Sequence, residues 1–507
     1  MMKKIIIGCI AVFSTAVILL ACSSNSGNKE VAEQKSPDKP NIVFILVDDL
    51  GYGDIGCFGQ EKILTPNIDK LAEEGMRFTQ AYAGNAVCAP CRSGLMQGLH
   101  PGHARVRGNS YKNYRESLQE GDYTVAMMLQ EAGYKTGLFG KWGLGLHDQY
   151  GIPNRMGFDE FYGYLNQRHA HNHYPEFLYH NTERVYYPEN GTHYIHENYR
   201  GEQPYDENGV CQPLGIEDPS KAKYAFDEYC KRSLEFVKEN KDHPFFLYLA
   251  YTPPHGAYYV PELGVYHEKD WSLSHKVYAA MITRVDTEIG KLNQLLEELN
   301  LDKNTLILFA SDNGNTNGNS KKDEISTKEF FNNESPRRGQ KGDIYDGAFH
   351  VPAIAKWPEK IKPEQVSDHI WAMWDFLPTA AEIVGVEAPE NIDGISILPT
   401  LMGKENQKEH EFLYWEYKAE QAVRMKDWYG YKNKKGEFEL YNLIQNPEQN
   451  KNVAEEHPEI ANRILEIMTT EHIPSDVWPS PGETDEAFKD RMIKLGIPER
   501  PNNIANF

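Results

Sequence analysis

The feature that most constrains the fold of this chain is a set of fully apolar runs separated by segments with helical spacing. Three runs rich in β-branched and aromatic residues have the length of buried strands: 41–47, 245–251 and 305–310. Apolar residues recur at helical spacing in three intervening segments: 67–75, 124–132 and 278–299. Strands that are apolar at every position are typical of parallel sheets covered on both faces. We therefore predict an α/β fold with a large, mostly parallel sheet flanked by helices.

The pattern changes near residue 394, which indicates a second domain. Three later segments alternate in polarity as antiparallel strands do: 412–417, 422–425 and 438–443. A helix is expected over 460–468, and the polar stretch 315–340 is expected to form a loop. We predict a large α/β domain over residues 40–394 and a smaller α+β domain with an antiparallel sheet over 395–507. The length of 507 residues agrees with two domains.

The N-terminus has the form of an export signal. Two lysines precede an apolar run over 5–20, which is short for a membrane span. The sequence Leu19-Leu20-Ala21-Cys22 resembles a bacterial lipobox. The resemblance predicts a lipoprotein signal peptide over 1–21 and lipidation of Cys22; an ordinary cleaved signal is the alternative. Residues 22–39 are polar and should form a flexible tether, so we expect an exported protein, anchored to a membrane by lipid only, in the periplasm or at the cell surface.

Net charge excludes one class of partner. A formal charge of −21 gives a surface that repels nucleic acid and anionic lipid at long range. An anionic substrate must therefore bind in a local basic pocket. The cysteines are too few and too scattered for a disulfide framework. Their spacing leaves open a single bridge between Cys211 and Cys230.

Two of the predicted strands end in acidic or amide side chains. Asp48 and Asp49 follow the first run, and Asp312 and Asn313 follow the run at 305–310. Ligands of open α/β sheets bind beyond the carboxyl ends of the strands. Three carboxylates and one amide oxygen suit calcium, and magnesium less well. A lone Asp-Asp pair often caps a helix or forms a turn, but two such strand ends in one chain favour a metal site.

Residues 88–98 follow the pattern C-x-P-x-R-x-x-L-x-x-G. This pattern resembles the maturation signature of the formylglycine-dependent sulfatases. Cys88 and Cys91 also form a C-x-x-C pair, which can be a redox dithiol or half of a zinc site. A zinc site needs a second pair at short spacing, which the other cysteines do not provide, and a redox dithiol belongs in a much smaller unit. A buried structural cysteine is the remaining alternative.

The resemblance implies a fold, a cofactor and a set of site residues. It implies an alkaline-phosphatase-like sheet, with Cys88 oxidised to formylglycine by a maturation enzyme. It implies one calcium ion held by the formylglycine and by the residues at both strand ends: Asp48, Asp49, Asp312 and Asn313. It also implies four catalytic residues in matching motifs: Arg92, Lys141 in Gly140–Gly145, His255 after Pro253-Pro254, and Lys341 in Arg338–Gly342. Without their motifs, the two lysines would be ordinary surface residues.

The implied chemistry is hydrolysis of a sulfate ester. One hydroxyl of the hydrated aldehyde attacks sulfur with Asp312 as base, and His255 protonates the leaving oxygen. The cations Arg92, Lys141 and Lys341 offset charge on the sulfuryl oxygens, and the second hydroxyl then expels sulfate. The chain departs from the family at Gly143, where a histidine that holds the formylglycine is common. We expect His147 as a possible substitute for that histidine.

The segment 167–175 is rich in groups that hydrogen-bond sugars. Five of its side chains are expected to line the leaving-group pocket: Gln167, Arg168, His169, His171 and His173. A second metal site or a polar surface loop are the alternatives for this segment. The chain resembles bacterial carbohydrate sulfatases here, so we expect a sulfated galactose or N-acetylgalactosamine unit. Two other functions compete: a phosphatase or phosphonate hydrolase on the same scaffold, and a glycan-binding lipoprotein that has lost catalysis.

Overall fold

A computed structural model describes residues 39–191, 204–316, 325–333, 335 and 337–500. The predicted signal peptide, Cys22 and all of the predicted tether except its last residue lie outside the described residues. Within the described part of the chain, no helix is long and apolar enough to cross a membrane. The described residues from Lys39 onward form one compact unit by their contacts.

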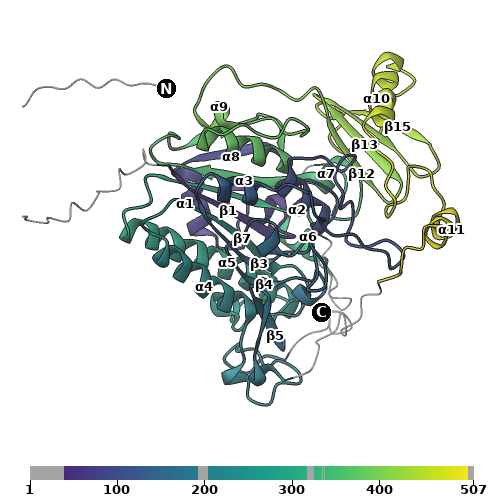
Figure 1. The fold of residues 1–507 in the computed structure, drawn as a ribbon. Coiled ribbons are helices and arrows are strands. Elements are labelled where there is room, and N and C mark those ends of the chain that lie inside the picture. The colour runs from purple at the N-terminus through teal and green to yellow at the C-terminus, as the bar shows by residue number, and fades with distance from the viewer. Residues whose placement is uncertain (1–38, 192–203, 317–324, 334, 336, 501–507) are drawn as a thin grey trace, which may run out of the picture. The chain divides into compact units, whose positions relative to one another are not determined.

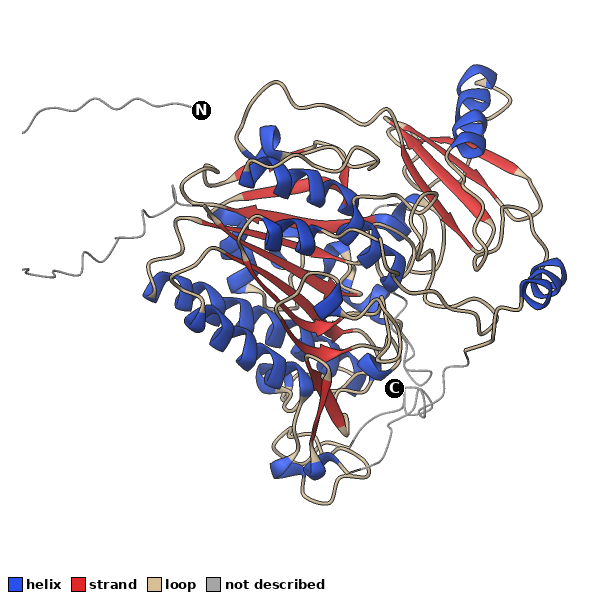
Figure 2. Cartoon of the chain, in the orientation of Figure 1, coloured by secondary structure: helices blue, strands red, loops and turns tan. Residues whose placement is uncertain are grey.

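The centre of the molecule is an eleven-stranded sheet (Figures 1 and 2). Strand β1 (Asn41–Asp48) lies in its middle, parallel to β7 (Phe245–Pro254) on one side and β8 (Thr305–Ser311) on the other. Further strands beyond β7 are, in order, β3 (Lys135–Lys141), β4 (Glu160–Tyr164), β5 (Phe177–His180) and β6 (Glu183–Tyr186). Those beyond β8 are β9 (His350–Lys356), β2 (Met76–Tyr82) and β10 (Gln365–Ser367), with β11 (Trp371–Ala372) also paired to β2. The prediction of a large, mostly parallel sheet is confirmed.

The sheet is not parallel throughout. Strand β9 runs antiparallel to both β8 and β2, and β4, β5 and β6 form an antiparallel edge. The parallel core is β8-β1-β7-β3-β4. All strand ends that carry predicted site residues belong to this core, so they meet at one edge of the sheet.

Alternate residues of β1 enter two separate cores, as the two-residue period of a strand requires. Ile42, Phe44 and Leu46 pack in the core on one face. This face is covered by α2 (Cys88–Gln97), α3 (Val125–Glu131) and α8 (Phe376–Val384). Val43, Ile45 and Val47 pack on the other face, which is covered by α1 (Pro66–Glu73), α4 (Ala225–Glu239) and α5 (Leu273–Glu298). Helices on both faces confirm the predicted flanked sheet (Figure 2).

A four-stranded antiparallel sheet follows in the chain. Its strands are β12 (Leu413–Tyr417), β13 (Glu420–Met425), β14 (Trp428–Lys432) and β15 (Phe438–Asn442), joined in sequence order. Helix α10 (Pro458–Thr470) packs on one face, and α11 (Asp485–Leu495) follows it in the chain. The sequence prediction missed β14, which pairs with strands on both sides. The short helices α7 (Asp346–Phe349) and α9 (Leu398–Leu401) complete the described elements, together with α6 (Thr327–Phe331).

Two expectations change with the structure. The stretch expected to be one polar loop, 315–340, contains helix α6, which begins at the N-cap Ser326, whose side chain accepts a hydrogen bond from the backbone N–H of Glu329. The aromatic pair Phe330-Phe331 gives this helix its apolar contact with Trp271. The bridge between Cys211 and Cys230 does not form, because both are buried free thiols.

Trp415 fixes the smaller sheet to the larger one. Its side chain is fully buried, its ring stacks on Phe349 at 4.5 Å between centroids, and its Nε1 donates to the carbonyl of Ala83 at 3.0 Å. We expect Trp415→Ala to lower the free energy of unfolding by about 3–5 kcal/mol, measured by urea titration, because it leaves a large cavity. Trp428→Ala, at a half-buried ring of the same sheet, should cost clearly less. Equal losses for the two variants would contradict this assignment.

Candidate active site

The carboxyl ends of β1 and β8 bring the predicted acidic residues together. Val47 is paired with Ser311, so Asp48-Asp49 and Asp312-Asn313 follow in register. The backbone N–H of Asp49 donates to Oδ1 of Asp312 at 3.2 Å. Asp49 has a φ of 66°, which turns the chain sharply at the end of the strand. The four residues are buried, at 5 % exposure or less.

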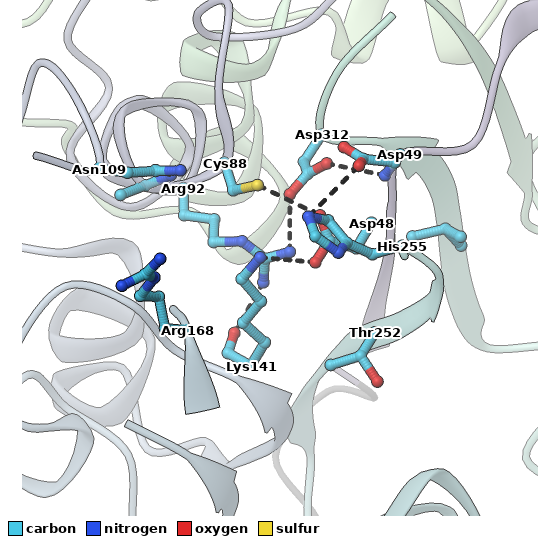
Figure 3. A network of polar contacts seen from close by, with 12 residues as sticks. Asp48, Asp49, Cys88, Arg92, Asn109, Lys141, Arg168, Thr252, His255 and Asp312 are labelled. Atoms are coloured by element: carbon cyan, nitrogen blue, oxygen red, sulfur yellow. Dashed lines mark hydrogen bonds and ion pairs between the residues drawn. The ribbon is translucent and has the colours of Figure 1, made fainter. Parts of the chain in front are cut away.

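Cys88 is the first residue of α2, and this end of the helix faces the acidic residues (Figure 3). Its Sγ lies 3.2 Å from Oδ1 of Asp48, and the side chain is fully buried. Burial, with the charge of Asp48, raises the pKa of the Cys88 thiol to about 12. An unmodified thiol here is therefore protonated near neutral pH, and only the thiolate is an effective nucleophile.

Three cations, of which Arg92 and Lys141 are buried and Lys341 is half-buried, each pair with one of the three carboxylates. Nζ of Lys141, at the end of β3, lies 2.6 Å from Oδ2 of Asp48. An Nη atom of Arg92, one turn after Cys88, lies 2.7 Å from Oδ2 of Asp312, and its other Nη donates to the carbonyl of Lys141 at 2.7 Å. Nζ of Lys341 lies 2.7 Å from Oδ2 of Asp49. The pairing makes the formal charges of these six side chains cancel.

The cations and burial pull the carboxyl pKa values apart. Burial favours the neutral form of Asp48, but the charges of Lys141 and Arg92 oppose it and hold the pKa well below its usual range. Burial raises the pKa of Asp49 to about 7 although Lys341 opposes the shift, and Asp48 and Asp312 add to it. The pKa of Asp312 is raised mainly by burial, with Asp48 contributing. Divergent carboxyl pKa values within one buried cluster are typical of functional sites.

Two oxygens of the cluster show that the residues fit a cation. Oδ1 of Asp49 and Oδ1 of Asn313 are buried, and neither has a hydrogen-bond partner among the described residues. Buried acceptors without a partner are costly, so each calls for a ligand. Atoms of Asp48, Asp49, Cys88 and His255 also lie within 4.8 Å of one another, close enough to hold one metal ion. Carboxylate and amide oxygens are donors that calcium prefers.

His255 closes the site on the side of β7. Its Nε2 lies 3.4 Å from Oδ2 of Asp49, and its ring stacks on that of His171 at 3.9 Å between centroids. His173 contacts the His255 carbonyl through Nε2 at 3.2 Å. Burial, with His171 and Lys341, holds the pKa of His255 well below its usual range, so the ring is neutral as the site stands.

The remaining pocket residues fall into two groups. His171 and Arg168 lie by the site, and Figure 3 shows Arg168 near Arg92 and Lys141. His169 instead packs between the rings of Tyr164 and Phe177, and burial lowers its pKa to about 3. This aromatic packing places His169 in the wall of the pocket rather than on its surface.

Gln167 occupies the space beside Gly143. The backbone N–H of Gly143 donates to the carbonyl of Leu165 at 3.1 Å, which brings the two segments together. A Cβ at residue 143 would lie 1.9 Å from Nε2 of Gln167, so a larger residue would require the Gln167 side chain to move. Both amide atoms of Gln167 are buried without a hydrogen-bond partner among the described residues.

The expectation that His147 replaces a histidine at position 143 was wrong. His147 is exposed, because Leu146 and Gln149 close a turn that carries it away from the site. Nothing in the sequence indicated that Gln167 would fill the space at Gly143. Asn109 was also missed: its Oδ1 accepts the N–H of Ala89 at 2.9 Å and so holds the first turn of α2.

A second histidine–carboxylate cluster lies apart from these residues. His100, His103 and Glu471 approach within 4.8 Å of one another, and His103 Nδ1 lies 2.8 Å from Oδ1 of Asp393. The backbone N–H of Gly102 donates to His100 Nδ1 at 3.1 Å, which leaves Nε2 as the protonated nitrogen. A protonated nitrogen cannot bind a metal, so this cluster is a hydrogen-bonded link to the end of α10.

Comparison with known proteins gives two family matches. The model described as "Sulfatase" matches residues 40–386, and the model "N-sulphoglucosamine sulphohydrolase, C-terminal" matches residues 340–472. The N-acetylgalactosamine-6-O-sulfatase of Bacteroides thetaiotaomicron is 28 % identical over 494 residues, covering 86 % of this chain and 93 % of that protein. The human N-acetylgalactosamine-6-sulfatase is 30 % identical over 383 residues, covering 72 % of this chain and 66 % of that protein.

Solved structures resemble the whole fold. Ps i-CgsB superposes with a TM-score of 0.71 at 27 % identity, covering 91 % of this chain and 98 % of its own, and it has also been solved in complex with k-i-k-neocarrahexaose. The phosphonate monoester hydrolase of Agrobacterium radiobacter superposes with a TM-score of 0.63 at 20 % identity, covering 85 % of this chain and 96 % of its own, which is a likeness of fold alone.

The unpartnered oxygens at the site predict a metal-dependent stability. We expect calcium to raise the melting temperature and a chelator to lower it, because a ligand that binds only the folded state stabilises it. Asn313→Leu removes one of the two unpartnered oxygens and should remove most of the calcium-dependent shift, measured by thermal unfolding and metal content. Asn190→Leu, whose buried amide bonds the carbonyls of Pro175 and Lys223, should lower the melting temperature equally with and without calcium. A calcium shift that Asn313→Leu leaves intact would refute the assignment.

Proposed function

The chain belongs to the sulfatase family and is a sulfuric ester hydrolase, and from that premise we propose that it removes sulfate from a carbohydrate by means of a formylglycine formed from Cys88 and one calcium ion. The observation that carries the proposal is the buried Cys88 beside a charge-paired acidic cluster that has two unpartnered oxygens. Burial and the charge of Asp48 raise the pKa of the Cys88 thiol, which agrees with a residue that is converted before it acts.

The proposed conversion replaces the thiol of Cys88 with an aldehyde. It is an oxidation, and it requires a separate maturation enzyme and its oxidant. When formed, the hydrated aldehyde supplies one hydroxyl that attacks sulfur and a second whose loss of a proton releases sulfate. When bound, calcium supplies positive charge to the sulfuryl oxygens. Asp48, Asp49, Asp312, Asn313 and residue 88 would hold the ion.

The chain's own side chains have defined tasks in this proposal. Arg92, Lys141 and Lys341 stand around Cys88 and would bind the sulfate once carboxylates turn to the ion. Asp312, held by Arg92, would accept the proton of the attacking hydroxyl. His255 would protonate the leaving oxygen, because a bound anion favours the imidazolium form that burial now disfavours.

A carbohydrate substrate is supported by the related proteins and by the pocket. The relatives from Bacteroides thetaiotaomicron and human are named as N-acetylgalactosamine-6-sulfatases, and Ps i-CgsB was solved with k-i-k-neocarrahexaose. We propose that Gln167, Arg168 and His171 contact the leaving sugar. We propose a sulfated galactose or N-acetylgalactosamine unit as the substrate. Export and lipidation at Cys22 are further proposals, supported by the lipobox sequence alone.

The decisive experiment pairs a sulfate-release assay with mass spectrometry of the peptide around Cys88. Protein made with an active maturation enzyme should carry the aldehyde mass at residue 88 and release sulfate from sulfated galactose or N-acetylgalactosamine. Cys88→Ala should fold normally and lose at least about a thousandfold in kcat, since the nucleophile is absent. Full turnover by protein with an intact thiol would overturn the mechanism. Turnover of phosphate or phosphonate esters instead of sulfate esters would favour the hydrolase alternative.

Because the amide of Gln167 has no hydrogen-bond partner in the described part of the chain, its removal should preserve stability but weaken substrate binding. We expect Gln167→Leu to leave the melting temperature unchanged or higher, because the change removes a buried polar group that has no partner in the protein. The same variant should raise KM for a sulfated sugar about tenfold while affecting a small aryl sulfate far less.

Gln60→Leu is the matched control. The buried amide of Gln60 donates to the carbonyls of Gly53 and Phe331 and accepts from two backbone N–H groups. Its loss should lower the melting temperature and leave KM for both substrates unchanged. A fall in melting temperature for Gln167→Leu with no change in KM would show that Gln167 is structural.

A further inference from the structure

We propose that a groove lined by lysines binds a second anionic group of a sulfated glycan chain while one sulfate ester lies at Cys88. The groove has a volume of about 620 Å³ and is lined chiefly by Tyr111, Lys112, Lys418, Lys434, Lys435 and Asp485; we call it the lysine groove. Its walls come from the turn after Ser110, two hairpin turns of the β12–β15 sheet, and the segment before α11. The inference rests on the proposed function, because it extends the substrate from one sugar to a polyanionic chain.

The two carboxylates in the groove are already paired. Asp485 binds Nζ of Lys112 and accepts from the hydroxyl of Tyr111. Glu483 forms two hydrogen bonds with Arg491 at 2.8 and 2.9 Å. These partners offset the negative charge that the segment before α11 brings to the groove.

The other lysines have no such partner. Within the described part of the chain, no carboxylate forms an ion pair with Lys418, Lys434 or Lys435. Nζ of Lys418 lies over the ring of Tyr417, 4.7 Å from its centroid. The groove is therefore a positive surface on a protein whose net charge is −21. Such a local patch attracts an anionic group at short range despite the long-range repulsion.

The chain joins one wall of the groove to the site. Ser110 lines the groove and follows Asn109, whose side chain accepts a hydrogen bond from the N–H of Ala89, the residue next to Cys88 (Figure 3). A glycan chain carries anionic groups at intervals, so one such group can bind at the groove while another lies at Cys88.

The test compares a groove variant with a control of equal charge. The groove variant is Lys418→Gln, Lys434→Gln and Lys435→Gln together; the control is Lys238→Gln, Lys241→Gln and Lys303→Gln, three exposed lysines elsewhere. With a sulfated oligosaccharide, the groove variant should raise KM about tenfold at unchanged kcat, and the difference from wild type should shrink at high salt. With the sulfated monosaccharide, KM should stay within about twofold, and the control should match wild type on both substrates.

Other outcomes overturn the inference. If KM rose equally for the monosaccharide and the oligosaccharide, the lysines would act on the reacting sugar and not on a second group. If KM changed for neither substrate, the groove would not take part in binding. Groove-dependent binding to anionic lipid vesicles, with unchanged oligosaccharide kinetics, would assign the groove to a membrane. Binding of the oligosaccharide to Cys88→Ala, with and without the groove substitutions, can be measured by calorimetry. This measurement tests the groove without any turnover. A wild-type protein that releases no sulfate would therefore contradict only the proposed function.

Discussion

The structure depends on the pairing of six charged side chains, five of them buried, at one edge of a sheet. Asp48, Asp49 and Asp312 are held by Lys141, Lys341 and Arg92 in one-to-one pairs, each at 2.6–2.7 Å. A buried charge left without its partner costs several kcal/mol. The pairs come from β1, α2, the end of β3, the end of β8 and the loop before α7, so each of these elements must reach the same point. This requirement links the packing of the large domain directly to its chemistry.

The central strand makes that convergence possible. Every residue of β1 is buried, and its two sets of side chains fill the cores on both faces of the sheet. Because β7 and β8 are parallel to it and in register, His255 and Asp312 arrive at the same edge as Asp48. Helix α2 then adds Cys88 and Arg92 from one turn of one helix. Strand register therefore sets the positions of Asp48, His255 and Asp312, whereas Gln167, Arg168 and His171 lie on the turn that follows β4.

The sequence predicted the sheet, its flanking helices and the residues that gather at the site. The hydrophobic period, the residues at strand ends and the cysteine motif are all local signals. The sequence did not predict β14, because pairing with β13 and β15 determines that strand. It also did not predict α6, which lies in a polar stretch. Sequence patterns also missed how Gln167 fills the space at Gly143 and how His171 stacks on His255. Those contacts join segments that only the tertiary fold brings together, and His147 was misplaced for the same reason. The roles assigned to the site residues stay predictions.

An acidic enzyme that acts on a sulfated glycan repels its substrate at long range and must attract it at short range. At physiological ionic strength the screening length is about 8 Å, so the net charge of −21 acts weakly beyond the first layers of solvent. Within that distance the nearest side chains decide, and both the site around Cys88 and the lysine groove place cations there. Buried pairs are screened less than exposed ones, so the site should hold one sulfate at any ordinary salt concentration while the groove responds to salt. Raising the ionic strength would then weaken binding of the glycan chain at the groove without affecting cleavage of one sulfate ester at Cys88.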